Sequence, residues 1–332
     1  MRILLLGGTG FLGRAIASTA LGRGHKVVCL ARGNGRLVDG VQFVQADRDG
    51  ENALLPVSEE RWDTVIDLAR HPIHAKRAVS DLNTEHWIFI STSSVYSRGD
   101  ILEQDESAPL LDPLDADFMA DMTQYGSAKV ACEGIYRESS PSCTIIRPGL
   151  IGGNEDHTGR SGYYPWRFAH PTGNDVLVPD LTFPVALIDG EDLAVWIIHC
   201  AETRARGTFN AAGDTAELFE VIDLSKEVAS SSAVPRVVSN DALSAAGVSP
   251  WMGSKSLPLW VDDPDYRYVA TLDSSSAKER GLTLRPLRET LASALQYEEN
   301  RDRPRVAGLT DEEERRLRQL LDYRAENGCP SS

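Results

Sequence analysis

The feature that most constrains the fold of this chain is a glycine-rich turn near its N-terminus. Residues 7–13 read Gly-Gly-Thr-Gly-Phe-Leu-Gly, between an apolar run at 3–6 and a helical pattern that extends to about 21. Glycines at this spacing allow a tight strand-to-helix turn and close approach of the backbone to a pyrophosphate. The N-terminus of the helix then offers free N–H groups and the positive end of its dipole to the anion. The turn predicts a dinucleotide site, with a purely structural turn as the alternative, and the expected contacts are Gly7, Gly10, Phe11, Leu12 and Gly13.

Short apolar runs alternate with helical patterns through the first half of the chain. This alternation is typical of a parallel sheet covered by helices on both faces. We therefore expect an α/β fold, a Rossmann-type doubly wound parallel sheet with a smaller C-terminal α+β substrate domain. The expected strands are 3–6, 26–30, 41–45, 64–68, 87–91 and 143–147, and the expected helices begin after the glycine turn or cover 72–82 and 121–137.

The pattern changes after residue 149, which indicates a second part of the molecule. Residues 152–173 are rich in Gly, His and aromatic residues and are expected to form a loop-rich insertion over a cleft. Regularity returns with a strand at 184–188. A helix at 191–200 and a strand at 208–211 follow, and we expect these two to return to the main sheet. The division is therefore 1–150 plus about 184–212 for the dinucleotide-binding domain, 151–183 and 213–300 for the substrate-binding part, and 301–332 for a charged C-terminal helix and tail.

Charge and composition argue against several kinds of partner. The formal net charge of −15 is opposite to the basic footprint that nucleic acids and anionic membranes attract. No run approaches the roughly 18 apolar residues of a membrane span, and no signal-peptide pattern is present, so a cytoplasmic location is expected. The five cysteines are scattered without a C-x-x-C pair, so we expect neither a disulfide framework nor a metal site.

The residues after the second expected strand bear on the choice of dinucleotide. An acidic residue there binds the ribose 2′-hydroxyl of NAD, whereas an arginine accommodates the 2′-phosphate of NADP. This chain has Arg32 at that point and no acid before Asp39, with Arg36 as a second candidate. NADP(H) is therefore favoured, with NAD(H) as the alternative if Arg32 is only a solvated surface residue. Asp47 is expected to bind the adenine amino group or to be an ordinary loop residue.

Two further segments carry groups suited to proton transfer. Tyr125 and Lys129 are four residues apart, which places them on one face of a helix. A phenol has a pKa of about 10, and moving it to about 7 requires roughly 4 kcal/mol of differential stabilisation, which a nearby cation can supply. Thr92 follows the strand at 87–91, at the sheet edge where open α/β sheets bind ligands. The alternatives are a chance spacing on the helix and a hydroxyl that only caps a loop.

Taken together, these segments resemble the short-chain dehydrogenase/reductase superfamily, and specifically its extended branch of NAD-dependent epimerases and dehydratases. The glycine turn is similar to its G-x-x-G-x-x-G, and Tyr125 with Lys129 to its Y-x-x-x-K. Residues 91–96, 147–149 and 189–194 match its S-[ST]-x-x-V-Y, R-P-G and D-x-x-D-[VL]-A segments. The resemblance covers about residues 1–212 and is much weaker beyond.

The resemblance implies an enzyme and a role for each matched residue. Tyr125 would be the catalytic acid/base, Lys129 would hold the nicotinamide ribose, and Thr92 would orient the substrate oxygen. A hydride would pass between the nicotinamide and a carbinol or carbonyl carbon. A homodimer is also implied. Further cofactor contacts would be Leu68, Ala69, Pro148 and Ile151.

Departures from the family pattern bear on the reaction. Ser93 and Ser94 stand where sugar-nucleotide dehydratases carry an Asp-Glu pair, and Arg32 replaces the acidic residue of epimerases that bind NAD tightly. We therefore predict an NADP(H)-preferring carbonyl reductase or dehydrogenase. The alternatives are an NAD-dependent nucleotide-sugar epimerase and, in another class, a non-catalytic dinucleotide-binding sensor.

The substrate is expected to be small and polar or sugar-like. The segment after residue 153 should overhang the active site, and it either contacts the substrate or only forms a lid. The candidate substrate residues are Ser93, His157, Arg160 and Tyr163.

Overall fold

A seven-stranded parallel sheet forms the N-terminal half of the computed structural model, which describes residues 1–33, 35–139 and 142–326. Its strand order is β13-β8-β7-β5-β1-β2-β3, so the chain winds outward from β1 in both directions, as in a doubly wound fold. The fold class predicted from the sequence is confirmed. The strands are β1 (Arg2–Leu6), β2 (Lys26–Ala31), β3 (Gln42–Gln45), β5 (Thr64–Asp67), β7 (Trp87–Ile90), β8 (Cys143–Pro148) and β13 (Gly207–Ala211).

Both faces of this sheet are covered, because alternate residues of each strand point to opposite sides. Ile3 and Leu5 of β1 pack in one core with α1 (Phe11–Gly22) and α6 (Gly190–Thr203). Leu4 and Leu6 pack in the opposite core with α3 (Pro72–Asp81) and α4 (Tyr125–Ser139). The continuous apolar sequence of β1 follows from this burial on two sides.

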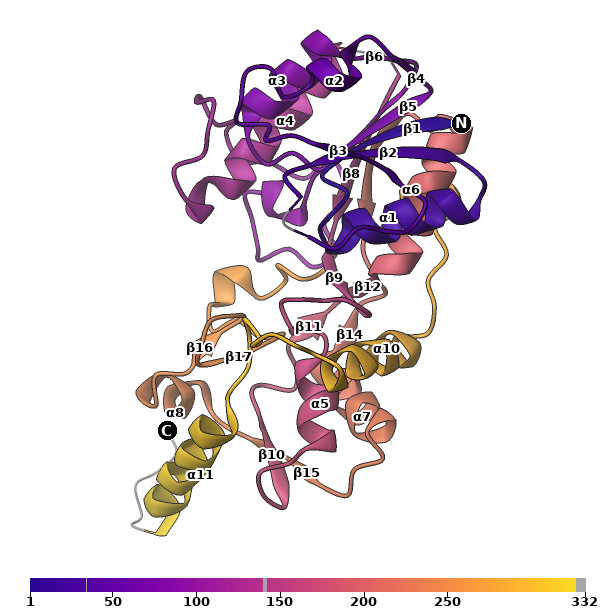
Figure 1. Cartoon of the computed structure of the whole chain (residues 1–332). Helices are drawn as coiled ribbons and strands as arrows, with labels where there is room; N and C mark the ends of the chain where they lie inside the picture. The colour runs from indigo at the N-terminus through magenta and orange to yellow at the C-terminus, as the bar shows by residue number, and fades with distance from the viewer. Residues whose placement is uncertain (34, 140–141, 327–332) are drawn as a thin grey trace.

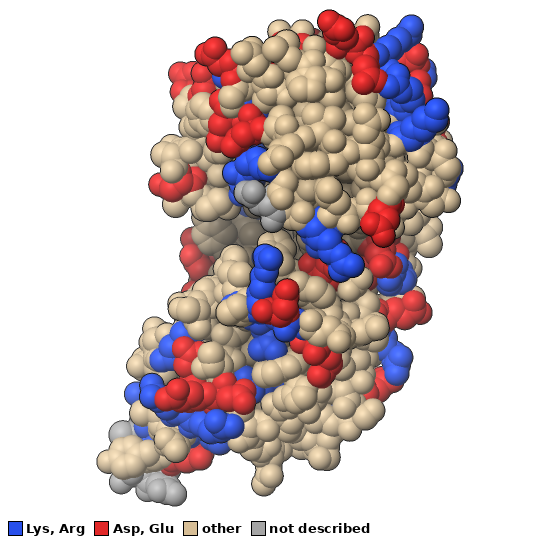
Figure 2. Space-filling model, viewed as in Figure 1, with Lys and Arg blue, Asp and Glu red and all other residues tan. Residues whose placement is uncertain are grey.

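The rest of the chain has its own core beyond the carboxyl ends of the strands (Figure 1). It is built on α5 (Tyr163–Ala169), α7 (Leu218–Val228) and α10 (Leu287–Glu299), and α11 (Asp311–Glu326) packs at its far end. Figure 2 shows a waist between the two parts on this face, with basic side chains on both sides of it.

Short elements connect and complete the second part. The paired strands are β9 (Leu150–Gly152) with β12 (Leu187–Asp189), β10 (Asp175–Val178) with β15 (Val234–Val237), β11 (Pro184–Val185) with β14 (Ala216–Glu217), and β16 (Ser249–Pro250) with β17 (Ser256–Leu257). The remaining elements are α2 (Leu55–Ser58), β4 (Arg61–Trp62), β6 (Asn83–Thr84), α8 (Asn240–Ala245) and α9 (Ser275–Glu279), with 3-10 turns η1 (Ser93–Val95), η2 (Met122–Gln124) and η3 (Pro264–Tyr266).

One expectation for the second half is wrong. The strand predicted at 184–188 is two short strands, β11 and β12, which pair with β14 and β9 rather than with the main sheet. The segment 152–173 contains one helix, α5, whose Tyr163, Tyr164 and Phe168 are buried. By contrast, β13 pairs with β8 in the main sheet and α6 packs beside α1, as predicted. The charged C-terminal helix is α11, and Thr310 and Glu313 form a capping box at its start, each accepting the other's backbone N–H. Residues 327–332 of the predicted tail lie outside the described residues.

A buried ion pair joins α4 to β8, and a hydrogen bond joins it to the end of β7. Glu133 is fully buried, and its two carboxylate oxygens accept hydrogen bonds from Arg147 Nε at 3.0 Å and Nη2 at 2.7 Å. The Ser91 hydroxyl, at the end of β7, donates to Glu133 Oε1 at 2.6 Å. Arg147 in turn donates to the Tyr96 hydroxyl at 3.1 Å. These bonds fix the helix that carries Tyr125 against the strand end that precedes Thr92.

Glu133→Gln is expected to lower the free energy of unfolding by about 3 kcal/mol or more, since it leaves the Arg147 guanidinium buried without its counter-charge. Urea denaturation measures the loss. The control is Glu312→Gln, which breaks an ion pair with Arg316 on the exposed face of α11 and should cost less than about 1 kcal/mol. Equal urea midpoints for the Glu133 variant and the wild type would contradict the expectation.

Candidate active site

The turn between β1 and α1 brings the helix so close to the end of the strand that a side chain at Gly13 would not fit between them. A Cβ atom on Gly13 would lie 2.4 Å from the carbonyl oxygen of Gly7 and 2.8 Å from the Cα of Gly8. Gly7 has a φ of 106°, which glycine adopts readily. Gly10 is the N-cap residue of α1 and has no side chain to bond the first N–H groups of the helix. Those N–H groups are therefore available to an anion.

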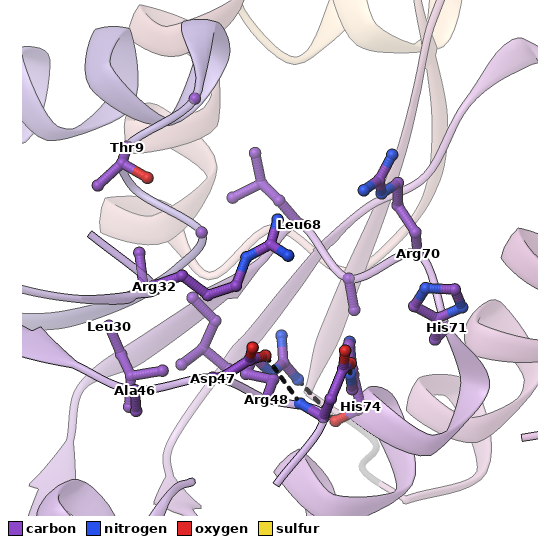
Figure 3. A pocket seen from close by; sticks show the side chains of 16 residues that line it. Thr9, Leu30, Arg32, Ala46, Asp47, Arg48, Leu68, Arg70, His71 and His74 are labelled. Atoms are coloured by element: carbon purple, nitrogen blue, oxygen red, sulfur yellow. Dashed lines mark hydrogen bonds and ion pairs between the residues drawn. The ribbon is translucent and has the colours of Figure 1, made fainter. Parts of the chain in front are cut away.

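A first cavity of about 360 Å³ lies beside this turn, at the carboxyl ends of β1, β2, β3 and β5. Arg32 and Asp47 line it, and in Figure 3 the Arg32 side chain extends over the cavity toward Leu68 with Asp47 beneath it. The Asp47 carboxylate also accepts the backbone N–H of Asp49 at 3.1 Å, so it has a local role in its loop. Arg36, the second candidate for a phosphate ligand, lines a different cavity beside Arg14.

Arg48, which lines the first cavity, belongs to a charged pair that could not be predicted from the sequence. Arg48 donates to both carboxylate oxygens of Asp67, at 2.6 and 2.9 Å, and to the carbonyl oxygen of His74 at 2.6 Å. The Tyr136 hydroxyl also donates to Asp67. Because Arg48 is bound in this way, Arg32 is the better placed of the two arginines for a ligand.

A second, larger cavity of about 680 Å³ contains the residues expected to do the chemistry. Thr92, Tyr125 and Lys129 all line it, and it shares Leu68 and Arg70 with the first cavity. Lys129 is buried, and its ammonium donates to the carbonyl oxygens of Ala69 and Ile90, each at 2.6 Å. It lies 5.9 Å from the centre of the Tyr125 ring. The two predicted sets of residues therefore form adjoining cavities at one edge of the sheet.

The predicted cofactor contacts are divided between the two cavities. Gly7, Gly10, Arg32, Asp47 and Ala69 line the first, Phe11, Leu12, Lys129, Pro148 and Ile151 line the second, and Leu68 lines both. Gly13 lines neither, because its contribution is the close packing of α1 on the turn.

The second part of the molecule covers the larger cavity. His157 and Arg160, from the loop after β9, line it together with Ser93 and with Trp251 from a distant part of the chain. Tyr163 does not line the cavity, and its selection as a substrate residue is corrected here. It is fully buried against Tyr164 and Arg167, because α5 turns its aromatic face into the core of the second part.

Two further glycines, Gly126 and Gly190, help to position the site and were not predicted from the sequence to do so. A Cβ atom on Gly126 would lie 2.1 Å from the carbonyl oxygen of Ser94, so this glycine lets α4 approach the turn that follows Thr92. A Cβ atom on Gly190 would lie 2.8 Å from the Phe11 ring. Each stands beside a residue of a recognised motif, and that adjacency was the available signal.

The histidines beside the first cavity bond to the protein itself. His71 accepts the backbone N–H of Met119 at 3.2 Å through Nδ1, and His74 Nε2 lies 2.9 Å from a carboxylate oxygen of Asp49. Burial lowers the pKa of both imidazoles. Within residues 1–33, 35–139 and 142–326, no group of three or more His, Cys, Asp and Glu side chains is arranged to hold a metal ion. None of the helices in these ranges is long and apolar enough to cross a membrane.

Comparisons with known proteins agree with this arrangement. Residues 3–84 match the model of the NAD dependent epimerase/dehydratase family. A UDP-glucose 4-epimerase from Thermotoga maritima is 19% identical with a TM-score of 0.66, and the alignment covers 90% of this chain and 99% of that one. The UDP-N-acetylglucosamine 4-epimerase of Bacillus cereus is 18% identical with a TM-score of 0.65, and the alignment covers 93% of this chain and 100% of that one. Bordetella bronchiseptica WbmH, solved in complex with NAD⁺, is 18% identical with a TM-score of 0.66, and the alignment covers 89% of this chain and 97% of that one. No curated protein matches the chain.

Residues 3–84 are thus similar to the NAD dependent epimerase/dehydratase family, and the chain as a whole shares the fold of the two 4-epimerases and of WbmH. Both findings agree with the resemblance to the extended short-chain dehydrogenase/reductase superfamily that the sequence motifs suggest. At identities below 20%, the solved structures establish the fold and leave the substrate to be argued from the site.

Gly10→Ala is expected to weaken coenzyme binding at least about tenfold without lowering the thermal unfolding temperature. A Cβ atom at Gly10 meets nothing within 4 Å in the protein, yet Gly10 lines the first cavity, so the added methyl group would meet only a bound ligand. Calorimetric titration with NADPH and NADH measures the effect. Gly22→Ala is the matched control, because its Cβ also meets nothing within 4 Å and lies at the other end of α1. Unchanged coenzyme affinity in the Gly10 variant would show that the ligand does not approach this turn.

Proposed function

We propose that this protein is an NAD(P)-dependent oxidoreductase that reduces a carbonyl group of a small polar substrate, with NADP(H) as the preferred coenzyme. The observation that carries the proposal is that Thr92, Tyr125 and Lys129 line one cavity that adjoins the glycine turn. A non-catalytic dinucleotide sensor would not need this set of side chains. The second part of the molecule would then bind the substrate, in keeping with its residues over the larger cavity.

The residues present fit a dinucleotide. Gly10 places no side chain over the first N–H groups of α1, where a diphosphate would rest, and Arg32, at the end of β2, lines the adjoining cavity. Phe11, Pro148 and Ile151 would enclose the nicotinamide. When bound, the reduced coenzyme supplies a hydride to the carbonyl carbon.

The side chains of the larger cavity would manage the accompanying proton. The hydroxyls of Thr92 and Tyr125 would donate hydrogen bonds to the carbonyl oxygen and polarise it. Tyr125 would then transfer its phenolic proton to that oxygen, as a general acid. The fixed positive charge of Lys129 favours the resulting phenolate, and its two carbonyl acceptors hold it in place.

The coenzyme preference is argued from Arg32. Its side chain extends over the first cavity, and no described residue forms an ion pair or hydrogen bond with its guanidinium, although its backbone carbonyl accepts Gln45. A guanidinium in that state is suited to the 2′-phosphate that distinguishes NADP(H). The family model names NAD and a neighbour was solved with NAD⁺, so NAD(H) is the competing choice.

A nucleotide-sugar epimerase is the second candidate. It is favoured by the family match and by the two 4-epimerases that share the fold. An epimerase oxidises and then reduces the same carbon, and so consumes no coenzyme overall, whereas a reductase consumes NADPH in proportion to product. Steady loss of NADPH absorbance therefore supports the reductase, and product formation without net redox supports the epimerase. A homodimer and a cytoplasmic location are further parts of the proposal, based on the resemblance and on the sequence.

Tyr125→Phe is expected to reduce kcat at least about a hundredfold, because it removes the proton donor, while coenzyme affinity stays within about threefold of wild type. Steady-state kinetics and calorimetric titration measure the two effects. Tyr297→Phe removes a phenolic hydroxyl from α10, away from both cavities, and should leave kcat unchanged. Retention of full turnover by the Tyr125 variant would exclude the proposed acid.

Arg32→Ala is expected to raise the Kd of NADPH about tenfold to a hundredfold and to leave the Kd of NADH within about threefold, because only NADPH carries the 2′-phosphate. Arg36→Ala is the control, since Arg36 lines a separate cavity and should leave both constants unchanged. An equal effect of Arg32→Ala on both coenzymes would contradict the proposed preference.

A further inference from the structure

The larger cavity has a charge opposite to that of the whole protein. The chain has a formal net charge of −15, yet the cavity is lined by three permanent cations, Arg70, Lys129 and Arg160, and by one acid, Asp156. An excess of positive charge in a cavity of an acidic protein selects for a ligand of negative charge. Arg70 also lines the first cavity and so lies where the two cavities meet, which leaves the question of which of the other groups is free to bind the ligand.

Lys129 and Asp156 are both engaged by the protein. The Lys129 ammonium donates to the carbonyl oxygens of Ala69 and Ile90. One carboxylate oxygen of Asp156 accepts the Thr158 N–H at 2.9 Å and its hydroxyl at 2.6 Å, and the other accepts the Ser161 N–H at 3.0 Å and its hydroxyl at 2.8 Å. Asp156 therefore shapes the loop that carries Arg160 and does not bind the guanidinium.

Arg160 has the properties of a receptor for an anion. Its Nε lies 3.2 Å from the Thr158 hydroxyl, and its guanidinium carbon lies 5.3 Å from the centre of the Trp251 ring. No carboxylate in the described part of the chain forms an ion pair or a hydrogen bond with it. Burial lowers the pKa of Arg160, and the negative charge of Asp156 opposes that shift. Its two terminal amino groups are left without a counter-charge in a half-buried place.

The side chains around Arg160 determine what else the ligand must be. The Trp251 ring lies within cation–π distance of the guanidinium, so one neighbour of the cation is aromatic and offers it no counter-charge. Met252, Val261 and Val269 line the same cavity and are apolar. An anion with two oxygens in one plane meets the guanidinium through a pair of parallel hydrogen bonds, which are among the strongest in proteins.

We infer that the substrate is a carbonyl compound with an apolar body and an anionic group, a carboxylate or a phosphate, and that Arg160 is the specificity-determining residue that binds this group. The inference rests on the proposed function, since it assigns the part of the substrate that does not react. The unpaired guanidinium favours such a ligand because binding supplies the counter-charge that the protein lacks.

The test compares three aldehydes of nearly equal size, 4-formylbenzoate, 4-formylphenyl phosphate and the neutral 4-formylbenzamide. Calorimetric titration of the full-length protein saturated with NADP⁺ gives their Kd values, and NADPH oxidation gives kcat/KM. We expect at least one of the two anions to bind about tenfold or more tightly than the amide. The better of the two identifies the group as a carboxylate or a phosphate.

Variants of Arg160 connect this preference to the residue. Arg160→Gln should reduce the preference for the anion to less than about twofold. Arg160→Lys retains the positive charge but not the paired N–H donors of the guanidinium, so it should retain part of the preference. The matched control is Arg280→Gln, because Arg280 also lies 5.3 Å from an aromatic ring, that of Phe209, and is outside the cavity. It should retain the full preference.

Three results would overturn the inference. The three aldehydes bind with equal affinity, none of the three binds, or Arg160→Gln retains the full preference for the anion. Failure of the proposed function would look different, because the anion would bind preferentially through Arg160 while NADPH was not consumed. Conversely, turnover of the amide at the rate of the anions would support the reductase and exclude the anionic substrate.

Discussion

The contact on which the site depends is the approach of α1 to the end of β1. Gly13 allows it, since any Cβ at that position would meet the carbonyl oxygen of Gly7. The approach places the first N–H groups of α1 beside the carboxyl edge of the sheet. Arg32 and the carbonyl oxygens that bind Lys129 lie at the same edge. A diphosphate at that helix terminus would have its two nucleoside ends directed along the two cavities.

The two parts of the molecule contribute different kinds of side chain. The N-terminal part supplies groups that are fixed by buried bonds, such as Lys129 on the carbonyl oxygens of Ala69 and Ile90 and Arg147 on Glu133. The second part supplies groups such as Arg160, which retain donors without acceptors. Lys129 and Arg160 line one cavity, so a ligand bound there would meet one cation that is fixed and one that lacks a counter-charge.

The parts of the fold and site that were predictable from sequence are those whose signals are local. The glycine turn, the strand and helix alternation and the spacing of Tyr125 and Lys129 each lie within a few residues of chain, and each is found as expected. Tyr163 was misjudged because composition does not show which way an aromatic residue faces when a short helix covers it. Trp251 and the Glu133–Arg147 pair could not be predicted, because their roles depend on contacts between segments far apart in the sequence.

Calorimetric titration of the wild-type protein with NADPH and with NADH tests the central claim most directly. The account predicts saturable binding of one coenzyme per chain, tighter for NADPH and weakened by added salt, because the contacts are with phosphate groups. No heat of binding for either coenzyme at concentrations up to about 1 mM would contradict it, since the glycine turn would then hold no diphosphate.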